Sequence, residues 1–243
     1  MAEKPGSFRW SGWLDWLYPG VCRLCGDAVA GGGSVCGACA RSIPEVREPF
    51  CSTCSEGFEG RIDAVFDCPN CRDQTFAFDF ARAGVQRSQA GMELVHQFKY
   101  GRCIDLARDL AGLALKAFSD PRLQPALEER WPLVPVPLHW RRRGWRRFNQ
   151  ALEIARPLGR ELGLPVVAAL KRVRATRTQT RLSRKERQRN LRGAFRLAAA
   201  VDAWRGAVLI DDVFTTGSTV NECARVLTQA GVQKVVVVTV MRG

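Results

Sequence analysis

Eight of the ten cysteines in this chain fall into four Cys-x-x-Cys pairs near its N-terminal end, and this pattern limits the possible folds more than any other feature. Two cysteines separated by two residues can both reach one metal ion from a tight turn, and a second pair completes a closed tetrahedral site of four thiolates. The pairs therefore predict two structural zinc sites in a segment that is too short to fold without metal. The predicted ligands are Cys22, Cys25, Cys36, Cys39, Cys51, Cys54, Cys68 and Cys71.

The spacers between successive pairs contain ten, eleven and thirteen residues, which are lengths of small hairpins. They favour sequential pairing, with the first two pairs on one zinc ion and the last two on the other. A cross-braced arrangement that joins the first pair with the third is the alternative. Disulfides would need an oxidising compartment, and an iron–sulfur cluster would also use thiolates, but four evenly separated pairs are more typical of zinc ribbons.

Charge and hydropathy limit the location and the partners. Residues 1–9 contain no secretory signal, and no stretch approaches the roughly 18 to 20 apolar residues of a membrane helix, so we expect a cytoplasmic protein without a transmembrane segment. The formal net charge is +13, and two four-thiolate zinc sites, at about −2 each, would still leave the chain basic. A basic excess favours nucleic acid, phosphorylated metabolites or an anionic membrane surface as partners.

Strand and helix patterns alternate from about residue 76. The apolar runs are typical of a parallel sheet covered by helices on both faces, so an α/β domain is expected. Three segments are predicted: an amphipathic segment at 1–21 with Trp10, Trp13 and Trp16, a double zinc-ribbon module at 22–75, and the α/β domain at 76–243. The expected helices are 92–100, 104–118, 150–162 and 218–230, and the expected strands are 76–80, 132–138, 165–170, 194–197, 207–210 and 235–240.

Residues 208–219, VLIDDVFTTGST, form the most informative stretch of the chain. The pattern predicts a buried strand that ends at two acidic residues, followed by a short loop of Thr, Gly and Ser and then a helix. Such a loop presents backbone N–H groups and hydroxyls to an anion at a helix N-terminus. The adjacent carboxylates would repel a phosphate, and they suit ribose hydroxyls or a divalent metal ion instead.

This stretch resembles the phosphoribosyl pyrophosphate (PRPP) motif of type I phosphoribosyltransferases. The resemblance implies that Asp211 and Asp212 engage the ribose hydroxyls and that Mg²⁺ accompanies PRPP. It assigns the 5′-phosphate to Thr215, Thr216, Gly217, Ser218 and Thr219. Residues 134–138 resemble the strand before the pyrophosphate loop, and residues 178–180 resemble the flexible lid. The corresponding pyrophosphate and lid candidates are His139, Arg141 and Gln179.

The order of motifs along the chain resembles the ComF family of bacterial competence proteins, which includes relatives called GntX. After the cysteine pairs come Phe98-Lys99-Tyr100, Pro-x-Pro-Leu, RFNQ at 147–150, Thr-Gln-Thr, Arg187-x-x-Asn190 and the PRPP motif. The resemblance implies a double zinc ribbon followed by a type I phosphoribosyltransferase-like domain. It also implies a role in natural transformation on single-stranded DNA, with a helicase-like ATPase as a candidate partner.

Two basic segments lie beside the candidate PRPP loops, at 141–147 and 171–192. Arginines contact phosphates and tryptophans stack on bases, so this composition favours a single strand of nucleic acid. The alternative is a solvated loop that partly serves PRPP. The nucleic-acid candidates are Trp140, Arg141, Arg142, Arg143, Trp145, Arg146 and Arg147.

Two functional hypotheses follow. The first is an accessory protein of DNA uptake that binds PRPP, or a phosphoribosyl moiety, and single-stranded DNA. The second is an active phosphoribosyltransferase that releases pyrophosphate from Mg–PRPP to an unidentified acceptor. The sequence shows no obvious general base, and the module that recognises a base in nucleotide-salvage enzymes is replaced by the cysteine pairs. Catalysis and the catalytic residues therefore remain open.

Overall fold

The computed structural model describes residues 20–29, 33–62, 64–138, 148–174, 186, 190–201 and 203–243. Within these residues no helix is both long and apolar enough to cross a membrane. Several sequence predictions fall outside the described residues: the amphipathic segment with Trp10, Trp13 and Trp16, and the candidates His139, Trp140, Arg141, Arg142, Arg143, Trp145, Arg146, Arg147 and Gln179.

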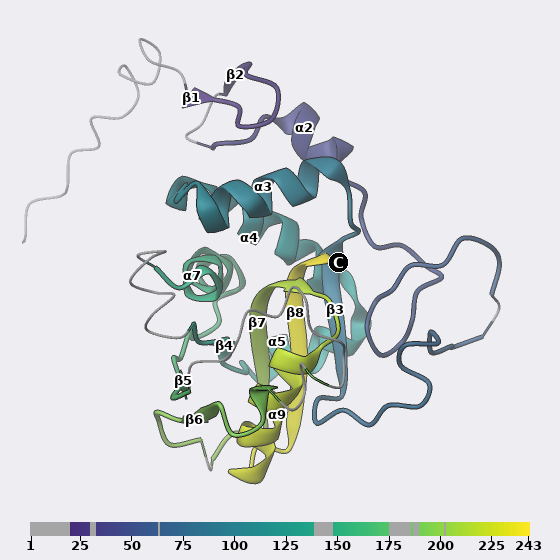
Figure 1. The fold of residues 1–243 in the computed structure, drawn as a ribbon, viewed down its shortest axis with the longest axis vertical. Coiled ribbons are helices and arrows are strands. Elements are labelled where there is room, and N and C mark those ends of the chain that lie inside the picture. Colours follow the sequence, from purple (N-terminus) through teal and green to yellow (C-terminus); the bar gives the residue numbers. More distant parts are fainter. Residues whose placement is uncertain are drawn as a thin grey trace, which may run out of the picture.

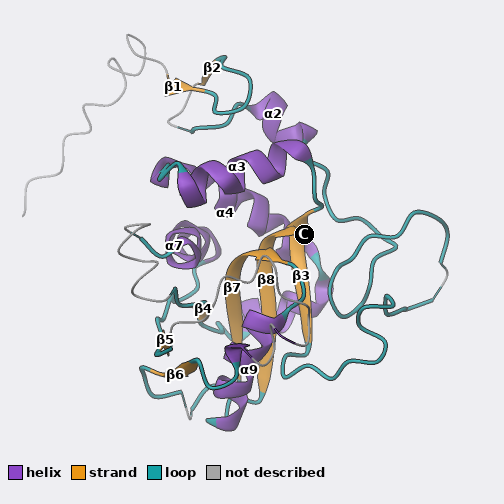
Figure 2. Ribbon diagram, in the orientation of Figure 1, coloured by secondary structure: helices purple, strands orange, loops and turns teal. Residues whose placement is uncertain are grey.

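A four-stranded parallel sheet forms the centre of the fold, in the order β3-β8-β7-β4 (Figures 1 and 2). Its strands are β3 Phe80–Val85, β4 Leu133–Pro135, β7 Gly206–Phe214 and β8 Lys234–Arg242. Continuous Val, Ile and Leu runs form β7 and β8 because both of their faces are covered. The expected α/β class is confirmed.

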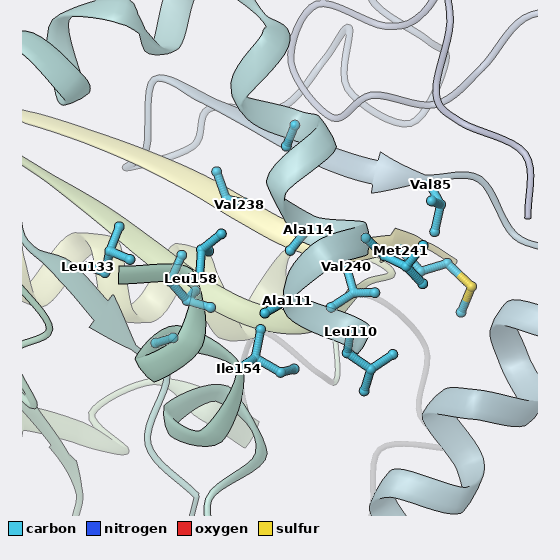
Figure 3. Packing of buried hydrophobic residues seen from close by; sticks show 14 of the residues in the cluster. Val85, Leu110, Ala111, Ala114, Leu133, Ile154, Leu158, Val238, Val240 and Met241 are labelled. Atoms are coloured by element: carbon cyan, nitrogen blue, oxygen red, sulfur yellow. The ribbon is translucent and has the colours of Figure 1, made fainter. Parts of the chain in front are cut away.

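Alternate residues of β7 and β8 divide between two hydrophobic clusters. Val208, Ile210, Val236, Val238 and Val240 pack with α3 Gln89–Tyr100, α4 Ala107–Leu115 and α7 Gln150–Leu162 on one face, and Figure 3 shows Leu110 and Ile154 in this cluster. The intervening residues pack with α9 Ser218–Gln229 on the other face. The period of two along each strand thus produces two cores.

Short elements complete the described chain. The 3₁₀ helix η1 Ile104–Leu106 lies between α3 and α4. Two further 3₁₀ helices and one short helix connect α4 to β4: η2 Lys116–Ser119, η3 Pro121–Leu123 and α5 Gln124–Glu128. A separate antiparallel pair joins β5 Leu170–Arg172 to β6 Phe195–Leu197. The cysteine-rich segment contains the hairpin of β1 Gly20–Val21 and β2 Ala28–Val29, the helix α2 Gly37–Ser42, and long loops.

Three predicted strands differ from the structure. Phe76 and Phe78 precede β3 rather than belonging to it, and their rings stack with centroids 4.7 Å apart. The segment 132–138 contains only the three-residue strand β4. In the segment 165–170, Val166 forms one bridge to Leu133 and regular pairing starts only at Leu170. In each case the apolar side chains are used for packing without a continuous partner strand.

The largest correction concerns the acidic pair. The prediction that the strand ends before Asp211 is wrong, because β7 continues to Phe214 and contains both Asp211 and Asp212. The neighbouring strand β8 extends in register with it, pairing Asp211 with Thr239 and Phe214 with Arg242. Asp212 is also buried, with 8% of its surface exposed.

Candidate phosphate site and cysteine clusters

The two carboxylates of the motif are held by different neighbours. Successive side chains of a strand point to opposite faces, so Asp211 and Asp212 are directed apart. The Asp212 carboxylate pairs with the ammonium group of Lys99, from the last turn of α3, at 2.7 Å. Asp211 accepts a hydrogen bond from the Asp212 backbone N–H at 2.9 Å. The structure thus gives the Phe98-Lys99-Tyr100 motif a defined contact with the acidic pair.

The environment of Asp211 changes its ionisation. Burial raises the pKa of Asp211 to about 7, and the negative charge of Asp212 adds to this effect. The positive charges of Lys99 and Arg172 oppose the rise without cancelling it. The sequence gives no sign of this shift, which comes from the environment of Asp211, and a carboxyl group with such a pKa can accept a proton at neutral pH.

The loop between β7 and α9 has the features of an anion site. Gly217 directly precedes α9 and adopts a left-handed conformation with φ 73°, and a Cβ at this position would lie 2.6 Å from the Phe214 ring. The hydroxyls of Thr216 and Ser218 are 2.9 Å apart. Because the first N–H groups of a helix lack intrahelical acceptors, the start of α9 offers donors and a favourable dipole to an anion.

Arg242, at the end of β8, contacts the start of this loop. Its Nη1 donates to the backbone carbonyls of Phe214 at 3.0 Å and Thr215 at 3.2 Å. The backbone N–H of Gly243 also donates to the Phe214 carbonyl, at 2.8 Å. Sequence patterns alone did not single out Arg242, and the only signal for it is a charged residue at the end of a buried apolar strand.

The cysteines form two groups of four with sequential pairing, the arrangement that the spacers favour. Cys22, Cys25, Cys36 and Cys39 form the first cluster, and Cys51, Cys54, Cys68 and Cys71 form the second. Within each cluster all four sulfur atoms lie within 4.8 Å of one another. The pairs Cys25–Cys36 and Cys54–Cys68 have Sγ–Sγ distances of 3.7 Å. Tetrahedral zinc with bonds of about 2.3 Å places its sulfur ligands about 3.8 Å apart, so both clusters fit the ion.

Local donors favour thiolates in both clusters. The Cys36 N–H donates to Cys22 Sγ at 3.3 Å, and the Cys68 N–H donates to Cys51 Sγ at 3.2 Å. Hydrogen bonds from the thiols of Cys54 and Cys71 hold the pKa of Cys51 well below its usual value. The pKa of Cys71 is raised, chiefly because its proton is shared with Cys51. Four thiols this close cannot all ionise without a cation, and zinc supplies that charge.

Comparison with known proteins identifies the family. The double zinc ribbon domain family matches residues 13–72. The DNA utilization protein YhgH of Salmonella typhimurium is 36% identical over 216 residues, covering 88% of this chain and 92% of that protein. Competence protein F of Haemophilus influenzae is 33% identical over 204 residues, covering 83% and 87%. The chain belongs to the ComF family.

Among solved structures, phosphoribosylpyrophosphate synthetase from Mycobacterium smegmatis aligns with this ComF-family chain at a TM-score of 0.32 and 16% identity, over 51% of this chain and 31% of that one. This similarity is too low to support an argument. The family match and the two four-cysteine clusters support structural zinc. The predicted boundary of the ribbon module at residue 75 stays a prediction. Of the two cysteines outside the clusters, Cys223 is buried and Cys103 is partly exposed.

Proposed function

We propose that this ComF-family protein binds Mg–PRPP, or the phosphoribosyl-like end of a nucleic acid, at the junction of β7 and α9. The observation that carries the proposal is the loop at 215–219, with a left-handed glycine and paired hydroxyls at a helix N-terminus. This loop would hold the 5′-phosphate through Thr215, Thr216, Gly217, Ser218 and Thr219. The carboxylates of Asp211 and Asp212 would engage ribose hydroxyls or Mg²⁺.

The ionisation of the acidic pair makes this proposal pH-dependent. A carboxylate must be charged to bind Mg²⁺ or to grip hydroxyls strongly. Since the pKa of Asp211 is about 7, binding of Mg–PRPP is expected to strengthen as the pH rises from 6 to 8. The ion pair between Lys99 and Asp212 offsets one charge before ligand binds, so the ligand would share or displace that ammonium group.

Transferase activity is the second candidate, and the environment of Asp211 favours it. A carboxyl group with a pKa of about 7 can act as a general base at physiological pH. In this reaction the acceptor would form a bond to C1 of the ribose, the bond from C1 to pyrophosphate would break, and Asp211 would take the acceptor's proton. The pyrophosphate would leave with its Mg²⁺.

We propose that the biological setting is DNA uptake in the cytoplasm. The names of the relatives refer to competence and to DNA utilization, and the formal net charge of +13 suits a polyanionic partner. Single-stranded DNA would contact the arginines and tryptophans of residues 140–147, with a helicase-like ATPase as the protein partner.

Two glycine substitutions test the ligand site. Gly217→Ala places a methyl group 2.6 Å from Phe214 in the loop, whereas Gly163→Ala, at the end of α7, meets nothing within 4 Å. Both residues have positive φ, 73° and 66°, so backbone strain should cost each variant about 1 kcal/mol of stability, and the contact with Phe214 adds a further loss in Gly217→Ala. Only Gly217→Ala should weaken Mg–PRPP binding in calorimetry, by about tenfold or more. Equal affinity in the two variants would show that the loop does not hold the ligand.

The same pair of variants separates the possible functions. If binding of a single-stranded oligonucleotide also falls in Gly217→Ala, the pocket holds a sugar-phosphate of the strand. If oligonucleotide binding is unchanged while PRPP binding falls, the two ligands use separate surfaces. Release of pyrophosphate from Mg–PRPP by the wild-type protein, stimulated by DNA or by a base, would identify the transferase.

A further inference from the structure

Arg242 contacts both the second cysteine cluster and the candidate phosphate loop. Its Nη2 lies 3.7 Å from Cys54 Sγ and forms an ion pair with Glu56, while its Nη1 donates to the carbonyls of Phe214 and Thr215. The residue is 6% exposed. Figure 1 shows the C-terminal end of β8 beside the long loops of the cysteine-rich segment. One buried guanidinium therefore joins two parts of the molecule that are distant in sequence.

The shape of the guanidinium explains why its two ends act together. The group is planar and carries its donors in a fixed fork, so the direction of Nη2 determines that of Nη1. Within the described residues the buried Nε has no hydrogen-bond partner, so the Nη contacts set the orientation. A buried positive charge requires a nearby negative one, and the thiolate cluster and Glu56 provide it.

The contacts of Nη1 also set the direction of the loop's donors. In a trans peptide unit the C=O and the N–H point in opposite directions. Because Arg242 holds the carbonyls of Phe214 and Thr215, the N–H groups of Thr215 and Thr216 are directed away from it. Arg242 thus fixes two of the N–H donors that an anion at this loop would need.

We propose that Arg242 is a positioning residue that couples the second cysteine cluster to the phosphate loop, so that metal binding by this cluster keeps the loop ready for its ligand. For the identity of the ligand this inference rests on the proposed function. Beside the first cluster, Ser34 donates instead to Asp105 in η1 and to Asp109 in α4, and none of these residues contacts the phosphate loop in the hydrogen bonds of the described residues. Metal loss from the first cluster therefore leaves the loop unchanged.

Arg242→Lys is the central test. A lysine keeps the charge but has a single ammonium group, which cannot hold the loop and the cluster together. Amide hydrogen exchange at residues 213–219 should become about tenfold faster, while elemental analysis still finds two zinc ions per chain. Mg–PRPP affinity should fall by about tenfold. Unchanged exchange and affinity, with the variant folded, would overturn the coupling.

Two carboxylates, one beside each cluster, provide a milder test of the coupling and its matched control. Glu56 pairs with Arg242 and is 43% exposed, whereas Asp27 accepts a hydrogen bond from Cys25 in the first cluster at 3.2 Å. Glu56→Gln should accelerate exchange in the loop, in the same direction as Arg242→Lys but less. Asp27→Asn should leave it unchanged. The same response in both variants would contradict the proposal.

Removing one ligand from each cluster tests the dependence on metal. Cys68→Ser weakens the second site without changing a residue that touches Arg242, and Cys36→Ser is its counterpart in the first. Only Cys68→Ser should accelerate exchange at 213–219. If Cys68→Ser does not fold, Arg242→Lys and Glu56→Gln still decide the question. If wild-type protein binds neither PRPP nor a single-stranded oligonucleotide at the loop, the proposed function is wrong, and the exchange measurements still show whether the cluster controls the loop.

Discussion

The two cysteine clusters share their Cys-x-x-Cys spacing but differ in burial. In the first cluster Cys25 is exposed and Cys36 and Cys39 are partly exposed, whereas all four cysteines of the second cluster are 5% exposed or less. Cys22 of the first cluster packs with the α3 and α4 side of the core, and the second cluster packs with Phe78, Ala81 and Phe214. The metal-binding pattern is therefore local, but its energetic role depends on the tertiary contacts around it.

The links from each cluster to the α/β domain differ in the same way. Near the first cluster, Asp105 accepts from the Ser34 hydroxyl at 2.6 Å and pairs with the half-exposed Arg23 at 3.0 Å. Near the second, the buried Asp120 pairs with Arg82 at 3.2 Å and with Arg122 at 2.7 Å. These arginines also donate to the backbone carbonyls of Val46 and Ser52, on the loops around the second cluster.

The largest difference in stability between the clusters is expected when one zinc ligand is removed from each cluster in turn. Cys54→Ser removes a ligand from the buried cluster and should lower the free energy of unfolding by roughly 4 kcal/mol or more, because buried thiolates lose their cation. Cys25→Ser, in the exposed cluster, should cost about 1 to 2 kcal/mol, since water solvates the remaining ligands. Thermal unfolding with zinc analysis would measure both, and equal losses would remove the distinction between the clusters.

The two linking carboxylates should give an intermediate effect. Asp120→Ala leaves Arg82 and Arg122 without their buried partner and should cost about 3 kcal/mol. Asp105→Ala breaks a half-exposed pair and should cost about 1 kcal/mol. Urea unfolding at pH 7 compares the variants. A larger loss for Asp105→Ala would mean that the first cluster, rather than the second, is the one integrated with the α/β domain.

The smallest expected effect is a pH dependence of the free energy of unfolding. Its sign differs between the carboxylates near the clusters and Asp211 at the ligand site. The pKa values of Asp105 and Asp120 are lowered, since favourable contacts with Ser34 and Arg23, and with Arg122, outweigh the opposing effect of burial. Their stabilisation is therefore lost as the pH falls through the folded-state values. The pKa of Asp211 is raised to about 7, so the folded state holds a proton at Asp211 more strongly than the unfolded state does. The stability that this proton gives is fully present below about pH 4 and is lost as the pH rises through 7.

Asp211→Asn should remove this loss while keeping the acceptor for the Asp212 N–H. The variant should match wild type near pH 4 and be more stable at pH 8 by on the order of 2 kcal/mol. Asp212→Asn is the control, since it breaks the ion pair with Lys99 and should destabilise the protein at pH 8. Urea unfolding at the two pH values gives the comparison, and a less stable Asp211→Asn at pH 8 would contradict the assigned environment.

Local sequence patterns by themselves determine much of this protein. The cysteine spacing identifies the eight zinc ligands and favours their sequential grouping. The helix α7 has the predicted bounds, Gln150–Leu162, because its apolar period ends at Gly163, which takes the left-handed conformation of a C-cap. The strand, loop and helix of residues 206–229 follow from an apolar run, a Thr-Thr-Gly-Ser-Thr segment and an amphipathic stretch.

Only the tertiary structure decided how these local elements depend on one another. Strand β7 continues through Asp211 and Asp212 because β8 offers a paired backbone in register, which no pattern within residues 208–219 reveals. The same is true of the contact between Lys99 and Asp212, and of Arg242, whose partner Cys54 is 188 residues away. Spacing and periodicity act over a few residues, whereas burial, pKa and pairing depend on which distant segments the core brings together.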